Sequence, residues 1–306
     1  MEFLINERAV DARGFPAHLT LLDFLRSQGL TGTKEGCAEG ECGACAVALV
    51  AGHGTGSTLR VVNSCLLFLP MLAGQEVYTV EGLARDGRLS EPQRGDCRAR
   101  RIAVRLLYPG LCRQPVRRVP PAGPDGPCDP HAMGGNLCRC TGYRPLRDAA
   151  LGLGMPPDDD FQRRLRRPAP PVGRVFAAAR GVRVRASGES GRLPGAARGA
   201  ATKRAWWRAL PIWRWKPICA ADRWPLLVSL EAVPELRGFR DADGEVEIGA
   251  GLTLSEIEAQ WVDAPPVMHH WFELFASPLI RNRATLGGNL ATASPVGDAA
   301  PAALGA

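Results

Sequence analysis

Two absences narrow what this chain can be. The 306-residue sequence contains no run of 18 apolar residues, so we expect no membrane-spanning helix. The opening stretch MEFLINERAV lacks a basic region followed by an apolar one, so we expect no secretory signal and a cytoplasmic location. Because the cytoplasm keeps thiols reduced, the ten cysteines are expected to be metal ligands rather than disulfides.

Charge is unevenly distributed along the chain. The formal net charge is +7, which by itself could indicate an acidic partner such as nucleic acid. The arginines, however, gather in two stretches, 94–118 and 163–214, and five of the seven tryptophans lie in 206–224. These stretches therefore need an explanation of their own, which is given below.

Four cysteines have the spacing of a plant-type ferredoxin. The stretch KEGCAEGECGAC, residues 34–45, contains C-x4-C-x2-C, and a further cysteine follows downstream. Its three glycines permit tight turns and let backbone N–H groups approach the sulfur atoms. A zinc site is the alternative, but zinc sites more often show two C-x-x-C pairs. The spacing predicts a [2Fe-2S] cluster held by Cys37, Cys42, Cys45 and Cys65.

The residues that flank these cysteines indicate a small mixed sheet. Residues 1–10 predict a first strand, and the stretch LTLLDFLRSQGL, 19–30, predicts a short helix with an apolar face. Residues 45–50 and 59–65 predict two more strands, separated by the turn-rich GHGTGS.

A second cysteine motif occurs in GGNLCRCTGYRP, residues 134–145. Its Cys138 and Cys140 are separated by one residue, which suits two ligands of one iron in a second [2Fe-2S] cluster. The other iron then needs two more thiolates. Cys112 and Cys128 could supply them, but neither their spacing nor a helical pattern supports this pairing.

The two cysteine motifs together resemble the iron–sulfur portion of the xanthine dehydrogenase family of molybdenum hydroxylases. The stretch FELFASPLIRNRATLGGNLATASPVGDAAP, residues 272–301, resembles the FAD domain of the same family. The resemblance covers residues 1–93, 131–160 and 226–306, and it is nearest to the bacterial small subunits that carry both clusters and the flavin.

The resemblance implies an α+β fold in three parts. These are a β-grasp ferredoxin-type domain (1–80), a helical 2Fe-2S domain (81–155) and, after a linker (156–175), a two-part α+β FAD-binding domain (176–306). It also implies a role in electron transfer. The molybdenum cofactor is expected on a partner chain, the molybdopterin-binding large subunit, and NAD is the expected acceptor. No catalytic residue is expected on this chain.

The glycine-rich run 285–298 is the candidate flavin site. Its glycines allow a phosphate to approach the backbone, its hydroxyl and amide side chains can donate to phosphate or ribitol oxygens, and its aspartate can accept from a sugar hydroxyl. A glycine-rich surface loop is the alternative. By resemblance, Phe275 lies near the flavin ring. The candidate cofactor-binding residues are Phe275, Thr285, Leu286, Gly287, Gly288, Asn289, Thr292, Ser294 and Asp298.

One expected element of the family is missing from the translated sequence. The resemblance implies a C-G-x-C pair about thirty residues before Cys138, but residues 103–116 read AVRLLYPGLCRQPV. Codons permitted for these residues, read one base later, give QCGYCTPGFVASL. Codons permitted for the stretch from Trp206, read two bases later, give VAGATDMALET, which resembles the first flavin loop of the family.

We therefore expect two separate frameshifts, which place 97–127 and 176–224 out of frame. Residues that were not selected to face a core should lack compact structure. Out-of-frame translation of a GC-rich gene also explains the arginines and tryptophans better than a nucleic-acid surface does, so no nucleic-acid partner is expected. The flavin domain is expected to be incomplete, because the sequence stops at AALGA before a further segment of the family.

Overall fold

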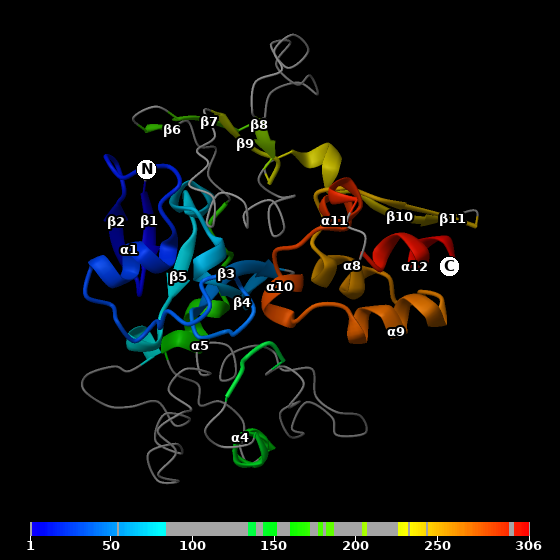
Figure 1. Ribbon diagram of the computed structural model, residues 1–306, viewed down its shortest axis with the longest axis horizontal. Helices are drawn as coiled ribbons and strands as arrows, with labels where there is room; N and C mark the ends of the chain where they lie inside the picture. The colour runs from blue at the N-terminus through cyan, green and yellow to red at the C-terminus, as the bar shows by residue number, and fades with distance from the viewer. Residues whose placement is uncertain are drawn as a thin grey trace. The chain divides into compact units, whose positions relative to one another are not determined.

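The computed structural model describes twelve segments of the chain. These are residues 2–53, 55–83, 134–138, 143–151, 160–171, 177–179, 182–186, 204–206, 226–231, 233–242, 244–293 and 297–305. The chain forms two compact units (Figure 1). The N-terminal unit contains Glu2–Ala12 and Leu19–Pro171, and the C-terminal unit consists chiefly of Arg13–His18 and Val172–Ala306.

A five-stranded mixed sheet forms the framework of the N-terminal unit, with strand order β2-β1-β5-β3-β4. The parallel pair is β1 with β5, and the other neighbours are antiparallel. A mixed sheet with helices confirms the predicted α+β class. The strands are β1 (Glu2–Ile5), β2 (Arg8–Asp11), β3 (Ala46–His53), β4 (Gly56–Asn63) and β5 (Glu76–Tyr78).

The prediction of one continuous strand over residues 1–10 is wrong. The structure has a hairpin there, in which β1 and β2 pair antiparallel with Ile5 opposite Arg8. The two residues between the strands, Asn6 and Glu7, have φ values of 51° and 68°. Two consecutive positive φ values are typical of the tight turn that joins the strands of a hairpin. Because glutamate is not a residue typical of such a turn, the sequence does not indicate the turn clearly.

The helix α1 (Leu21–Ser27) confirms the helix predicted over residues 19–30. It begins at Thr20, whose side chain accepts a hydrogen bond from the Asp23 N–H and so satisfies one of the unpaired donors of the first turn. Its apolar face is buried, and the ring of Phe24 lies 6.0 Å from that of Phe3 on β1. The helix thus packs on the sheet and places the cysteine loop directly after itself.

Short helices complete the N-terminal unit. Three 3-10 helices cover residues Ser64–Leu66, Leu69–Leu72 and Val80–Leu83, and two α-helices follow, α4 (Arg144–Leu151) and α5 (Asp160–Leu165). The described part of the expected linker, residues 160–171, packs against the sheet. Leu165 contacts a core cluster that includes Leu59, and the Ser57 hydroxyl donates to the Arg167 carbonyl at 2.9 Å.

The C-terminal unit contains a four-stranded sheet, a hairpin, five α-helices and one 3-10 helix among its described residues (Figure 1). The sheet has the order β6-β7-β9-β8, and the hairpin pairs β10 with β11. The strands are β6 (Ala177–Ala179), β7 (Val182–Ala186), β8 (Arg204–Trp206), β9 (Leu226–Ser229), β10 (Phe239–Ala242) and β11 (Glu245–Ile248).

The helices of this unit gather around one apolar core. They are the 3-10 helix Pro234–Leu236, α8 (Leu254–Gln260), α9 (Pro266–Leu274), α10 (Pro278–Arg281), α11 (Leu286–Thr292) and α12 (Ala299–Leu304). The core they share includes Ile257, Trp261, Met268 and Phe272. A capping box between Thr253 and Glu256 begins α8.

The range 176–224, expected to lack compact structure, contains three short strands in the structure, β6, β7 and β8. β6 pairs with β7, and both β7 and β8 pair in parallel with β9, which lies in the part of the sequence that carries the resemblance. The expectation is therefore wrong for these three segments, because backbone pairing within a sheet does not depend on which side chains they carry. The rest of this range and all of 97–127 lie outside the described residues, so the reading-frame hypothesis stays a prediction.

The described helices include none that combines the length and the apolar character needed to cross a membrane.

Candidate functional site

The loop between α1 and β3 brings two of the predicted cysteine ligands together. The Cys37 N–H lies 3.3 Å from the Cys42 sulfur, and the Cys42 N–H lies 3.4 Å from the Cys37 sulfur. The N–H groups of Glu39 and Glu41 also donate to the Cys37 sulfur, each at 3.4 Å. The loop thus directs several backbone dipoles at this pair of sulfur atoms.

These contacts change the acidity of the pair in opposite directions. Burial acts to raise the pKa of Cys37, but the backbone N–H groups outweigh it and the pKa of Cys37 is lowered. For Cys42, burial is the larger effect and the pKa of that thiol is raised. Within this pair, the environment therefore favours the thiolate, which is the form that binds metal, at Cys37 rather than at Cys42.

The other two cysteines form a second, deeper pair. Cys45 immediately precedes β3, and Cys65 lies in the 3-10 helix Ser64–Leu66 that follows β4. Both are buried beside Leu22 of α1. The hydrogen bond with the Cys65 thiol lowers the pKa of Cys45 to about 7, against the opposing effect of burial. The four thiols predicted from the spacing therefore form two pairs, Cys37 with Cys42 and Cys45 with Cys65.

Asn63, at the end of β4, connects the two ends of this loop. Its amide nitrogen donates to the Gly40 carbonyl at 2.7 Å, and its oxygen lies 3.8 Å from the Cys45 sulfur, which can donate to it. Asn63 is 2% exposed. One buried amide thus positions both the glycine turn and one of the candidate ligands, a role that the sequence pattern did not reveal.

The four thiols divide into two pairs, and within the described segments no three potential ligand side chains form a group that could hold a single metal ion. A [2Fe-2S] cluster instead takes two thiolates at each iron, which matches the Cys37–Cys42 and Cys45–Cys65 pairs. Gly36 leaves room for this arrangement, because a Cβ atom there would lie 2.7 Å from the Cys42 sulfur.

The second cysteine motif rests on the first loop. The Leu137 N–H donates to the Cys42 carbonyl at 2.9 Å. A Cβ atom on Gly43, whose φ is 72°, would lie 2.6 Å from the Gly135 carbonyl oxygen, so only glycine allows this close approach. Cys138 is buried, and its N–H donates to the Tyr143 hydroxyl at 2.9 Å. Cys140, its expected partner ligand, lies outside the described residues.

In the candidate flavin run, the residues from Thr285 to Asn289 form the N-terminal cap and first turn of α11. Thr285 caps this helix, since its buried hydroxyl accepts from the Gly288 N–H at 2.9 Å. Gly287 permits close packing, because a Cβ atom there would lie 2.6 Å from the Cβ atom of Ala250. Leu286 is buried in the core of the unit, and the Asn289 N–H bonds back to the Thr285 carbonyl.

Of the remaining flavin candidates, Thr292 lies at the end of α11 and the others lie outside this helix. Thr292 donates its hydroxyl to the Asn289 carbonyl at 2.7 Å, within the helix itself. Ser294 lies outside the described residues. Phe275 and Asp298, in contrast, line one cavity. The structure thus separates Thr285 to Asn289, which begin a helix, from Phe275 and Asp298, which face an open space.

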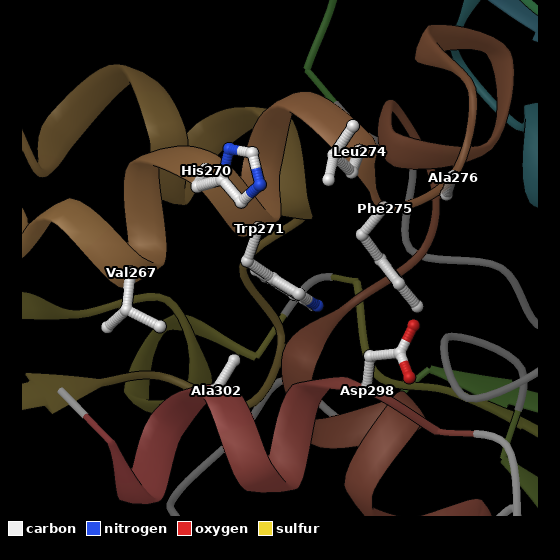
Figure 2. Close-up of a pocket in the computed structure, with 8 residues that line it drawn as sticks. All are labelled: Val267, His270, Trp271, Leu274, Phe275, Ala276, Asp298 and Ala302. Atoms are coloured by element: carbon white, nitrogen blue, oxygen red, sulfur yellow. The ribbon is translucent and has the colours of Figure 1, made fainter.

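That cavity has a volume of about 400 Å3 and lies between α9 and α12 (Figure 2). Figure 2 shows Trp271 and Phe275 projecting from α9 and its end, with the Asp298 carboxylate directly below the Phe275 ring in this view. The rings of Trp271 and Phe275 are stacked, with centroids 4.7 Å apart and planes inclined by 21°. The lining residues are Val267, His270, Trp271, Leu274, Phe275, Ala276, Asp298 and Ala302.

Most of these lining residues were not predicted from the sequence. The sequence does contain a periodic pattern for them, because Val267, Trp271 and Phe275 are spaced four residues apart and so project from one side of α9 and its end. An apolar stripe at this spacing is ordinarily the buried face of a helix, which conceals its second use as a cavity wall.

Two domain families match the chain. Residues 10–67 match the 2Fe-2S iron-sulfur cluster binding domain, and residues 220–306 match the FAD binding domain in molybdopterin dehydrogenase.

Known proteins match part of the chain in the same way. It is 36% identical to xanthine dehydrogenase of Emericella nidulans over 51% of its own length, and 35% identical to aldehyde oxidase 2 of Mus musculus over 52%. The chain spans only 12% of the length of each of these two relatives. Among solved structures, it is similar to quinoline 2-oxidoreductase from Pseudomonas putida 86. The identity is 28%, the TM-score is 0.37, and the match covers 50% of this chain and 90% of that one.

The fold and the two matched domains define the class, a protein with a ferredoxin-type 2Fe-2S domain followed by an FAD-binding domain. The two matched domains and these relatives support the resemblance of the chain to the molybdenum hydroxylase family, which includes xanthine dehydrogenases and aldehyde oxidases.

Proposed function

We propose that the chain is the electron-transfer subunit of a xanthine dehydrogenase. When bound, its iron–sulfur and flavin groups carry electrons from the molybdenum cofactor, held by a molybdopterin-binding large subunit, to NAD. The observation that supports this best is the arrangement of Cys37, Cys42, Cys45 and Cys65 as two thiol pairs in the matched 2Fe-2S domain. A cytoplasmic location accords with thiol ligands of this kind.

Each pair would hold one iron. Cys37 and Cys42 lie in the half-exposed loop, where backbone N–H groups stabilise negative charge on sulfur. Cys45 and Cys65 lie in the buried core, where Asn63 fixes the Cys45 side. This division leaves the Cys37–Cys42 pair closer to solvent than the Cys45–Cys65 pair.

Cys138 would be one ligand of a second cluster, with Cys140 as its partner. The hydrogen bond from the Leu137 N–H to the Cys42 carbonyl brings the residue beside Cys138 into contact with a ligand of the first cluster. The missing C-G-x-C ligands are explained in our proposal by the frameshift within 97–127. Resequencing the gene tests this directly, and an unshifted reading frame over that range would contradict it.

Flavin would be held by the C-terminal unit. Phe275 and Asp298 face the cavity between α9 and α12, where an aromatic wall and a carboxylate suit a flavin ring and a ribitol hydroxyl. The proposed frameshift within 176–224 removes the first flavin loop, so we expect FAD to bind weakly to the chain as it stands and tightly once both frames are restored.

A second candidate function is supported by the similarity to aldehyde oxidase 2, which is nearly as high as that to xanthine dehydrogenase. In this alternative the partner chain oxidises an aldehyde or an N-heterocycle, and this chain does the same work. A stand-alone 2Fe-2S carrier is a third reading, because only the first thiolate set is complete in this sequence.

The experiment that separates these functions uses a frame-repaired chain with cluster and FAD reconstituted. It is mixed with a molybdopterin-binding large subunit, and the bleaching of its visible absorbance is followed after adding xanthine, an aldehyde or quinoline. Bleaching by xanthine, and its reversal by NAD, is the expected result. Bleaching by an aldehyde or quinoline alone would favour the alternative, and no bleaching by any of them would contradict both.

A further inference from the structure

The cavity between α9 and α12 contains one hydrogen-bond donor that the fold does not use. Trp271 is 8% exposed, and its indole nitrogen Nε1 is buried and has no hydrogen-bond partner in the described segments. Figure 2 shows this nitrogen directed to the side of the cavity where Phe275 and Asp298 lie. A buried N–H without an acceptor is unfavourable, and it is ordinarily satisfied by a ligand or an ordered molecule.

The surroundings of this donor limit what can satisfy it. Trp271 and Phe275 present stacked aromatic surfaces, and Val267 and Ala302 add apolar walls. A volume of about 400 Å3 is in the usual range for a small-molecule site. The chemistry that fits is a planar heteroaromatic ring that carries an acceptor oxygen or nitrogen at the edge facing the indole N–H.

We propose that Trp271 positions the flavin ring by donating its Nε1–H to an acceptor atom of the isoalloxazine. This inference rests on the proposed function, because it takes FAD as the ligand of the C-terminal unit. The isoalloxazine is flat and carries its carbonyl oxygens on one half of the ring. The donor would therefore select the orientation in which that half lies at the indole, while the Asp298 carboxylate, also in the lining, accepts from the ribitol chain.

The indole N–H itself gives the test. The full chain is labelled with ¹⁵N at its tryptophan side chains, and the Trp271 signal is the indole resonance that disappears in Trp271→Phe. Riboflavin is the probe, because it has the ring and the ribitol but no pyrophosphate, so an altered first flavin loop does not decide the outcome. We expect riboflavin to move the Trp271 resonance downfield and to leave the Trp261 resonance in place.

A matched pair of variants gives the second measurement. Trp271→Phe keeps an aromatic ring but removes the donor, and Trp261→Phe makes the same change at a buried core residue that does not line the cavity. Loss of one neutral hydrogen bond predicts about two- to tenfold weaker riboflavin binding for Trp271→Phe, and less than about a twofold change for Trp261→Phe. If Trp271→Phe does not fold, the resonance is assigned from its through-space contacts with the Phe275 ring.

The outcomes distinguish this inference from the function on which it rests. If riboflavin and FAD bind while the Trp271 resonance stays in place and Trp271→Phe binds equally well, the inference fails and the proposed function stands. If adenosine monophosphate moves the Trp271 resonance and riboflavin does not, the cavity takes the adenine end and the inference fails. If no flavin binds even to the frame-repaired chain, both are contradicted.

Discussion

An ion pair between α5 and β5 offers a sharp test of how the N-terminal unit is held together. The Arg164 guanidinium forms a two-pronged contact with the Glu76 carboxylate, and one of its hydrogen bonds, from Nε to Oε2, is 3.0 Å long. The Arg164 and Glu76 side chains are only 16% and 1% exposed. The Tyr78 hydroxyl also donates to a Glu76 oxygen at 2.7 Å. Burial, together with the nearby Glu76 and Glu7 carboxylates, raises the pKa of Tyr78.

Arg164→Leu removes the positive partner and leaves the Glu76 carboxylate buried. Removing one member of a buried pair typically costs about 3–5 kcal/mol, so the free energy of unfolding of the N-terminal unit should fall by about that amount. Replacing both residues by leucine removes the uncompensated charge, and the double variant should recover most of the loss. Arg147→Leu is the control, because Arg147 and its partner Asp148 are both more than half exposed and such pairs contribute about 0–1 kcal/mol.

The assay is amide hydrogen exchange followed by mass spectrometry on peptides that cover β3 and β5, because it reports on the N-terminal unit separately from the rest of the chain. Faster exchange in Arg164→Leu, with recovery in the double variant, is the expected result. The reasoning is refuted if Arg164→Leu exchanges no faster than Arg147→Leu, or if the double variant is less stable than the single one.

Two further predictions concern the two sites. Gly287→Ala should destabilise the C-terminal unit by about 1–3 kcal/mol, because the new methyl group would meet Ala250; Gly238→Ala, which meets nothing within 4 Å, should be nearly neutral in the same hydrogen-exchange measurement. In the cluster-free chain at neutral pH, iodoacetamide should label Cys37 before Cys42. The lowered pKa of Cys37 gives it the larger thiolate fraction, while the raised pKa of Cys42 shifts its ionisation to higher pH. Labelling is read by tandem mass spectrometry, and equal labelling of the two would contradict this.

Local patterns in the sequence predicted the framework of the N-terminal unit. The spacing of the cysteines defined the loop because glycines and thiolates need fixed positions around a cluster, and the apolar face of residues 19–30 predicted α1. The hairpin turn at Asn6 and Glu7 was missed, because a positive φ at a glutamate is imposed by pairing with the rest of the sheet rather than by its own preference.

Contacts between distant residues were beyond the sequence patterns. The Asn63 side chain donates to the Gly40 carbonyl, and the Leu137 N–H donates to the Cys42 carbonyl. Nothing in the sequence around Asn63 or Leu137 indicates which distant residue it contacts. The flavin candidates show the same limit. The glycine run predicted a close backbone approach, and the structure shows one at Gly287, but there the neighbour is Ala250.

The central claim is that Cys37, Cys42, Cys45 and Cys65 hold one [2Fe-2S] cluster, and it is tested most directly on the chain exactly as encoded. The chain is reconstituted anaerobically with iron and sulfide, desalted, analysed for both elements, and examined by EPR after reduction. The account predicts about two irons and two sulfides per chain and a single EPR signal. It also predicts that Cys65→Ser loses or alters this signal and that Cys112→Ser leaves it unchanged. A chain that retains no iron would contradict the cluster assignment, and two distinct signals would contradict the frameshift.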